Sequence, residues 1–299
     1  MRRVLDFVLV IWLAATLAFM LLRVLPGDAI SAQLALSGAS RAEIEAIRDD
    51  MGLSAPLSRQ YLSYIGGLLR GDMGYSLTST LPVVEVIAPR LLPTLILALT
   101  SGVCAAVGGV LIGAACLNTG GVGRIARAVV NLSLSLPIYW TGTLAIIVFS
   151  SWLGWLPSSG THGADRLILP VLVLSIHVMA PVARVTYANL RQIHDATFVR
   201  VARAKGLPEL LILRRHILRA ALGPVIAVIA LQTGFLLSGA VITESVFARS
   251  GVGQLLLVST LDRDYPVVQG IVVLSAVFYM LVNVIADWST RLLDPRIVS

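Results

Sequence analysis

Six long apolar segments constrain this chain more than any other feature. Each approaches or exceeds the roughly 20 apolar residues that a helix needs to cross a bilayer. Only 13% of the 299 residues are charged, against about 25% in soluble proteins. We therefore expect an all-α membrane protein with six transmembrane helices, at residues 7–25, 93–117, 127–150, 167–189, 218–242 and 267–288.

The charges between these segments predict the orientation of the chain. Arg124 and Arg127 follow the second segment without an accompanying acid, and the loop after the fourth segment is strongly basic. Loops that stay in the cytoplasm are rich in Lys and Arg, so both termini are expected there. Arg2 and Arg3 could mark a cleaved signal, but the apolar run that follows is long and has no convincing cleavage site, which favours an uncleaved span.

Residues 26–92 form the one long segment predicted on the outer side. Ser40 and Glu43 have the spacing of a capping box, and Gly52 is a suitable helix stop. A second amphipathic stretch follows Pro56. We expect short helices that cover the outer mouth of the transmembrane bundle.

The cytoplasmic loop at 195–216 contains an amphipathic stretch from Phe198 to Gly206. At 100° per residue, Arg200 and Arg203 share one face of a helix, and Lys205 falls at the apolar edge. The opposite face is predicted to carry Phe198, Val201 and Ala202.

Gly206 is a natural helix stop, and Pro208 suits the first turn of a second short helix. Two short helices that meet at a glycine would form a rigid knob, and its position on the membrane face predicts contact with another protein.

Motifs for chemistry are missing from the chain. The only lysine, Lys205, lies between Ala204 and Gly206, so no phosphate-binding Gly-x-x-x-x-Gly-Lys-Ser/Thr loop can be assembled. The four histidines are scattered, and there is no His-Glu-x-x-His pair for zinc. Cys104 and Cys116 are predicted to be small packing residues. We expect no enzyme activity, no cofactor and no metal on this chain, and short basic loops argue against nucleic-acid binding.

Polar residues inside the apolar segments are candidates for a translocation path, because polarity that faces lipid is costly. Each could instead make ordinary hydrogen bonds between helices. Glu244 could be a gate residue or a solvated helix end. The pair Gly109 and Gly113 favours close helix packing. The path candidates are Asn131, Ser135, His177, Gln232, Glu244 and Asn283.

A set of motifs in a particular order resembles the permease subunits of the dipeptide, oligopeptide and nickel branch of ABC importers. The similar motifs are Leu25-Pro26-Gly27-Asp28, Gly71-Asp72-x-Gly74-x-Ser76, Phe198-Val-x-x-Ala-Arg-Ala-Lys-Gly206-Leu207, His216-x-Leu218-Arg219, Glu244-x-x-Phe247, Gly251-x-Gly253, Asp264-Tyr265-Pro266 and Leu293-Asp294-Pro295-Arg296. The chain departs from the pattern at Arg200, Ala220 and Ser250.

The resemblance implies the type I importer fold in a prokaryotic inner membrane. It also implies a second, related permease, two cytoplasmic ATPase subunits that bind ATP and Mg²⁺, and an extracytoplasmic binding protein. The residues that it assigns to ATPase coupling are Phe198, Arg200, Ala202, Arg203, Ala204, Lys205, Gly206, Leu207 and His216.

The resemblance favours di- or oligopeptides as the substrate. A nickel chelate, glutathione or another small solute stays open within the same machine. A self-sufficient secondary carrier or channel is the alternative from a different class, and it would predict an inverted repeat, which the sequence does not display.

Overall fold

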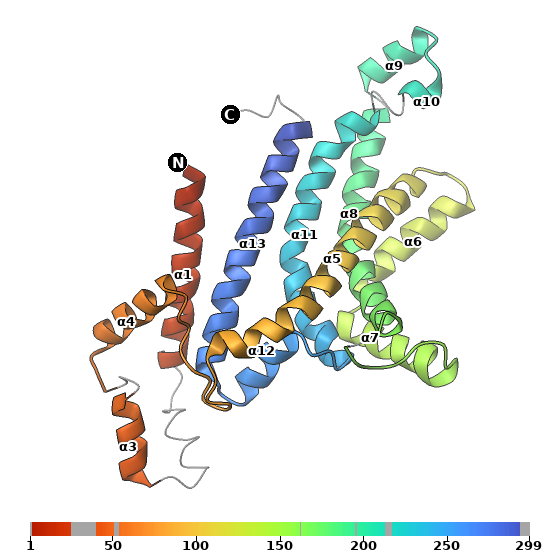
Figure 1. Ribbon diagram of the computed structural model, residues 1–299. Helices are drawn as coiled ribbons and strands as arrows, with labels where there is room; N and C mark the ends of the chain where they lie inside the picture. Colours follow the sequence, from red (N-terminus) through yellow and green to blue (C-terminus); the bar gives the residue numbers. More distant parts are fainter. Residues whose placement is uncertain are drawn as a thin grey trace. The chain divides into compact units, whose positions relative to one another are not determined.

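The computed structural model describes residues 2–24, 40–50, 54–161, 163–194, 196–212 and 217–293, and this part of the chain is almost entirely helical (Figure 1). An isolated bridge between Tyr75 and Pro82 is the only strand-like pairing within these ranges. The helices are α1 (Arg2–Val24), α3 (Arg41–Asp50), α4 (Leu57–Leu69), α5 (Val83–Ala115), α6 (Gly121–Ser135), α7 (Ile138–Ala145), the π-helical η1 (Ile146–Trp152), α8 (Asp165–His194), α9 (Thr197–Ala204), α10 (Glu209–Ile212), α11 (Leu218–Val246), α12 (Val252–Leu261) and α13 (Tyr265–Leu293).

Four helices of the described chain are long and apolar enough to cross a membrane, and a bent pair raises that number to five. The four are Val83–Ala115, Asp165–His194, Gly223–Val246 and Tyr265–Ile285. They coincide with predicted spans two, four, five and six. The first predicted span lies on α1, whose apolar part, Leu5–Met20, is shorter, and residue 25 lies outside the described residues.

The predicted single span at 127–150 is wrong in its shape. The structure divides it into α6 and the α7–η1 pair, which are bent by 111° relative to one another. The break falls at Leu136 and Pro137, where the chain is extended. Proline has no N–H for the helical ladder and pushes the residue before it out of the helical conformation, so the apolar run continues while the helix does not.

The outer segment at 26–92 is described from residue 40, apart from residues 51–53, which include the predicted stop at Gly52. The capping box is confirmed: the Ser40 N–H donates to Glu43 Oε2 at 2.7 Å, and the Glu43 N–H donates to Ser40 Oγ at 3.3 Å. The hydrogen bond from the Ser40 N–H lowers the pKa of Glu43.

The helix of the second predicted span begins at Val83 rather than at residue 93. Val83 and Ile87 are buried, while Glu85 is exposed in the first turn. An acidic residue there is favourable to the helix dipole. The helix therefore has an amphipathic first turn, which extends it ten residues upstream of the predicted span.

The chain divides into two compact units, which we describe separately. Unit 1 comprises Met1–Leu92 and Leu255–Met280. In it the rings of Phe19 and Tyr61 meet edge to face at 5.2 Å, which joins α1 to α4. The Asp264 carboxylate accepts hydrogen bonds from Ser76 Oγ at 2.5 Å and from Thr78 Oγ1 at 2.6 Å, so this side chain fixes the turn before α5.

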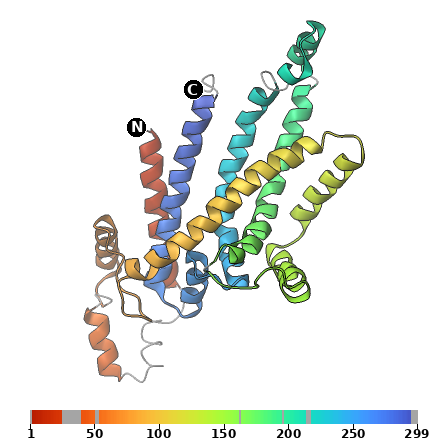
Figure 2. The same cartoon turned by 45° about the vertical axis from the view of Figure 1, so that its right-hand side comes forward.

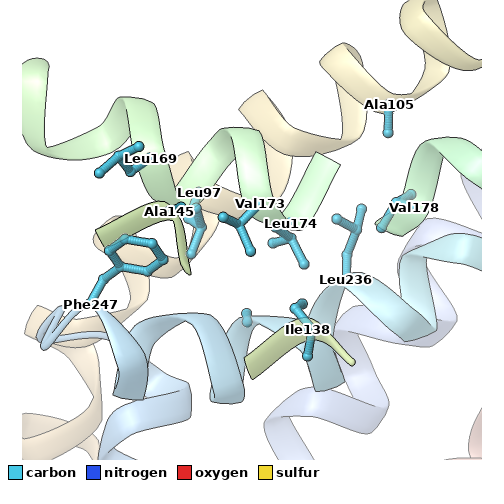
Figure 3. Close-up of a cluster of buried hydrophobic side chains, with 11 residues drawn as sticks. Leu97, Ala105, Ile138, Ala145, Leu169, Val173, Leu174, Val178, Leu236 and Phe247 are labelled. Atoms are coloured by element: carbon cyan, nitrogen blue, oxygen red, sulfur yellow. The ribbon is translucent and has the colours of Figure 1, made fainter. Parts of the chain in front are cut away.

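Unit 2 comprises Pro93–Gln254 and Leu281–Ser299. Its core gathers side chains of α5, α7, α8 and α11, together with Phe247 at the end of α11 (Figure 3). Space at Gly109 and Gly113 is tight, because a Cβ there would lie 2.7 Å from Val182 Cβ and 2.6 Å from Thr186 Cβ. The predicted close packing is therefore confirmed, with α8 as the partner of α5.

The two cysteines differ in their surroundings. Cys116 packs with Ala126, Val130 and Ala183 at the junction of α5, α6 and α8, as a small packing residue should. Cys104 is exposed on α5, so the packing prediction does not hold for it within this single chain.

Candidate functional site

The knob, which we define as residues 197–212, consists of α9 and α10 at one end of α8 (Figures 1 and 2). Gly206 has φ +75°. The Leu207 N–H donates to the Ala202 carbonyl at 3.3 Å, and the Gly206 N–H donates to the Arg203 carbonyl at 2.9 Å. This pair of bonds is the Schellman helix ending that glycine favours. The predicted stop at Gly206 is confirmed.

The second helix of the knob starts at Pro208. The Leu211 and Ile212 N–H groups both donate to the Pro208 carbonyl, at 2.9 and 3.1 Å. Proline suits this position because the first N–H groups of a helix have no partner within it. The two short helices are thus joined by a turn with a defined conformation.

The apolar face predicted for the first helix is partly wrong. Val199 and Ala202 are the buried residues, with exposed fractions of 0% and 5%, whereas Phe198 and Val201 are each 47% exposed. Residues 198 and 201 share one side of the helix and residues 199 and 202 share the next. The sequence could not tell which apolar side would pack inward, because both are hydrophobic.

A small core seats the knob on the bundle. Val199 and Ala202 of α9 and Ile212 of α10 pack against Leu190 of α8 and against Ile217 and Ala221 at the start of α11. Arg203 Nη2 lies 2.9 Å from His194 Nε2. The coupling residues Phe198, Arg200, Ala204, Lys205 and Gly206 are exposed, Arg203 and Leu207 are half-buried, and His216 lies outside the described residues.

The translocation candidates lie in different environments. His177 is buried on α8, and its Nε2 lies 3.0 Å from Thr141 Oγ1 of α7. Asn131 and Ser135 are exposed on α6, where Ser135 Oγ donates to the Asn131 carbonyl at 2.9 Å. Gln232 and Asn283 are half-buried on α11 and α13. The structure thus pairs His177 with another polar residue of the apolar segments, Thr141.

Glu244 is fully buried at the carboxyl end of α11, so its interpretation as a solvated helix end is wrong. Its Oε1 accepts a hydrogen bond from Thr94 Oγ1 at 2.6 Å. Its Oε2 accepts from the Gly253 and Gln254 N–H groups at 2.8 and 3.1 Å. We call Glu244, Thr94 and the amides that they bind the carboxylate clamp.

The clamp accepts hydrogen bonds from the N–H groups at the beginning of α12. The Val252 N–H donates to Thr94 Oγ1 at 2.8 Å, so the first three amides of this helix are all bound by two side chains that are distant in sequence. The first four N–H groups of a helix have no partner within it. A carboxylate at that end is favoured by the helix dipole and by charge-assisted hydrogen bonds.

Glycine is required where the backbone meets the clamp. A Cβ on Gly251 would overlap the Glu244 carboxylate, and a Cβ on Gly253 would lie 2.5 Å from Val241 Cα. Close approach of a backbone is the usual reason for glycine at such a position. The spacing Gly251-x-Gly253 therefore allows α12 to begin directly against α11.

Arg249 provides a positive charge beside the clamp. Its guanidinium is buried, and Nη1 donates to the carbonyls of Gly160 and Arg166 at 3.3 and 3.4 Å. Burial lowers the pKa of Arg249, and the Glu244 carboxylate opposes that shift. The buried carboxylate is therefore partly balanced by a fixed cation as well as by amide dipoles.

Thr94 was not among the candidate residues. It lies near the start of a predicted span, where one hydroxyl between apolar residues carries no distinctive pattern. The only available signal was the pair Gly251-x-Gly253 near a glutamate, which suggests a close backbone approach but does not identify the residue on the other helix.

Comparisons with known proteins agree with this architecture. The chain matches the model "Binding-protein-dependent transport system inner membrane component" over residues 109–299, and the model of the N-terminal region of such components over residues 1–98. It is 36% identical to the glutathione transport system permease protein GsiC of Escherichia coli K12, over 99% of this chain and 97% of that protein. The corresponding protein of Pectobacterium atrosepticum is 38% identical over the same shares.

Solved structures show the same fold at low sequence identity. An inward-facing form of the MetNI methionine ABC transporter matches with a TM-score of 0.60 and 20% identity, covering 70% of this chain and 97% of that one. An amino acid ABC transporter with histidines gives a TM-score of 0.57 at 16% identity, over 70% and 94% of the two chains. Because the family model covers more than half of the chain, this protein belongs to the inner membrane components of binding-protein-dependent transport systems, the permeases of ABC importers.

Proposed function

We propose that the knob is the docking element for an ATPase subunit and that this permease forms part of the import path for short peptides. The observation that carries the docking proposal is the combination of a packed internal core with an exposed apolar and basic surface. Val199 and Ala202 seat the knob, while Phe198, Val201 and Arg200 are left exposed. Exposed apolar residues rimmed by charge are typical of protein contacts.

ATP binding by the partner subunits would act on the transport path through this element. The cytoplasmic position of the knob is proposed from the basic loops of the sequence, as is the cytoplasmic position of both termini. To shift a two-state equilibrium from 1:99 to 99:1, the ATPases must supply about 5.5 kcal/mol of differential binding. A knob with a packed core and a fixed helix ending can transmit such a bias.

Short peptides are the proposed cargo because the curated relatives at 36–38% identity are named for glutathione transport and align from end to end. Glutathione is itself a tripeptide. The proposed assembly contains a second, related permease, two ATPases and a binding protein. A nickel chelate is the alternative cargo. His177 and Thr141, which form a partly buried polar pair, are the proposed contacts of the path.

The docking proposal is tested at Gly206. A Cβ there would meet no atom within 4 Å, so we expect a substitution to act mainly through the positive φ of the backbone. Asn tolerates positive φ, whereas a β-branched residue does not. We expect Gly206→Val to abolish co-purification of the ATPase subunits and Gly206→Asn to retain it, with equal membrane insertion. Normal ATPase recovery with Gly206→Val would refute the proposal.

The cargo is tested with the proposed extracytoplasmic binding protein of this importer. Its melting temperature should rise with glutathione or with di- and tripeptides and should be unchanged by nickel complexes. A rise with a nickel complex alone would reassign the cargo while leaving the docking proposal intact.

A further inference from the structure

We propose that Glu244 is a positioning residue that fastens the first turn of α12 to α11, so that movement of α11 is passed to α12 during transport. The proposal deepens the proposed function, since it takes the knob as the point where the ATPases act. It assigns a role to a buried carboxylate that neither binds a nucleotide nor lies exposed to a path.

The amino end of α11 is part of the knob core. Ile217, which precedes the helix, and Ala221 in its first turn are both buried against Val199, Ala202 and Ile212. A displacement of the knob therefore cannot leave the start of α11 in place without opening that core. Packed interiors transmit such strain because they contain few voids.

Between its two ends α11 is one continuous helix. It contains 29 residues, which at about 1.5 Å per residue corresponds to a length of about 43 Å. Its sides pack on α8 and α7 within unit 2. The helix thus connects the knob to a site that lies too far away for direct contact.

The carboxyl end of α11 holds α12 through the clamp. Oxygens of Glu244 and Thr94 bind the amides of Val252, Gly253 and Gln254, and glycine at position 251 leaves no side chain between the two helices. Glu244 has an exposed fraction of 0%, so water cannot take the place of these N–H donors. Separation of α12 from α11 would take the Gly253 and Gln254 amides away from the buried carboxylate, and the loss of such buried partners is costly.

Weakening the clamp should consequently uncouple the movement of α12 from that of α11 while the ATPase subunits stay active. The ATPases would still bind the knob and hydrolyse ATP, but α12 would follow α11 less closely. We therefore expect a loss of transported substrate per ATP consumed, which a purely structural role would not produce.

Thr94 offers a matched pair for this test. Thr94→Val keeps the shape but removes the hydroxyl that donates to Glu244 and accepts from Val252, whereas Thr94→Ser keeps the hydroxyl. The complete importer, with both permeases, the ATPases and the binding protein, is reconstituted in vesicles, and peptide uptake and ATP hydrolysis are measured together. Thr94→Val removes two buried hydrogen bonds, so we expect it to lower uptake per ATP about tenfold or more and Thr94→Ser to restore it.

Leu174→Ala is the control for lost stability. Leu174 is fully buried in the core of unit 2 and is not part of the clamp, so this variant should lower uptake and hydrolysis in proportion. An unchanged ratio in Thr94→Val would overturn the proposal for Glu244. If the ATPases do not co-purify with the unmodified permease through the knob, the proposed function fails instead, so the two failures are distinguishable.

Discussion

The two ends of α11 contact different regions of unit 2: the amino end packs against the knob, and the carboxyl end carries Glu244 of the carboxylate clamp. These two regions place their charged residues in opposite ways. Among the knob residues whose side chains are described, the buried ones are apolar, Val199, Ala202 and Ile212, while Arg200 and Lys205 are exposed. In the clamp Glu244 is buried, and Arg249 beside it is buried as well, so neither charge is exposed to solvent.

The comparison indicates at which residues a mutation should affect the stability of the permease. Exposed charges can be exchanged with little effect on stability, because water solvates them in both the folded and unfolded states. A buried charge depends on every partner that it has. We therefore expect substitutions in the clamp to lower the stability of the permease, whereas substitutions on the knob surface weaken docking with little effect on stability.

The largest effect is expected for Gly251→Ala. The added Cβ would overlap the Glu244 carboxylate, and overpacking of a rigid site costs about 1–3 kcal/mol or more. In thermal unfolding of the detergent-purified permease, this variant should melt at a lower temperature than any single variant of the knob. Gly223→Ala is the control, because a Cβ there meets nothing within 4 Å and alanine is the better helix former. A melting temperature for Gly251→Ala equal to that of the control would contradict the clamp geometry.

Glu244→Gln should have the next largest effect. The amide keeps one acceptor oxygen but directs an NH₂ group either at the amides of α12 or at Thr94, and a buried donor without an acceptor costs about 1–3 kcal/mol. Amide hydrogen exchange of the first turn of α12 should become faster than that of α8. Unchanged exchange in α12 would mean that the carboxylate does not hold this helix.

The smallest effect on stability is expected on the knob, where two neighbouring residues provide a direct test. Phe198→Ser changes a half-exposed side chain. It should change the free energy of unfolding by no more than about 0.5 kcal/mol, as ordinary surface substitutions do, while it weakens recovery of the ATPase. Val199→Ala creates a cavity in the knob core and should lower the stability of the permease. A loss of stability in Phe198→Ser together with none in Val199→Ala would mean that the apolar face predicted from the sequence, with Phe198 inward, is the correct one.

Much of the architecture was accessible from the sequence, because length and hydropathy report directly on helices that cross lipid. The knob was accessible as well, since Gly206 and Pro208 act locally on the backbone. A proline alone does not predict the break at Pro137, because Pro170, Pro181 and Pro224 lie inside helices that continue through them. What the sequence could not reveal was that α6 and α7 bend by 111°, because that angle depends on the packing of α7 against α8 and α11.

The sequence by itself determined the class of protein, the basic loops and the knob, which all depend on local composition and on residues a few positions apart. Only the tertiary structure decided which apolar side of α9 is buried, and that Glu244 meets Thr94 from 150 positions away in the chain. The physical reason is that a hydrogen bond between distant segments depends on where the whole bundle places their backbones. A glutamate at a helix end has the same sequence pattern whether it is solvated or buried.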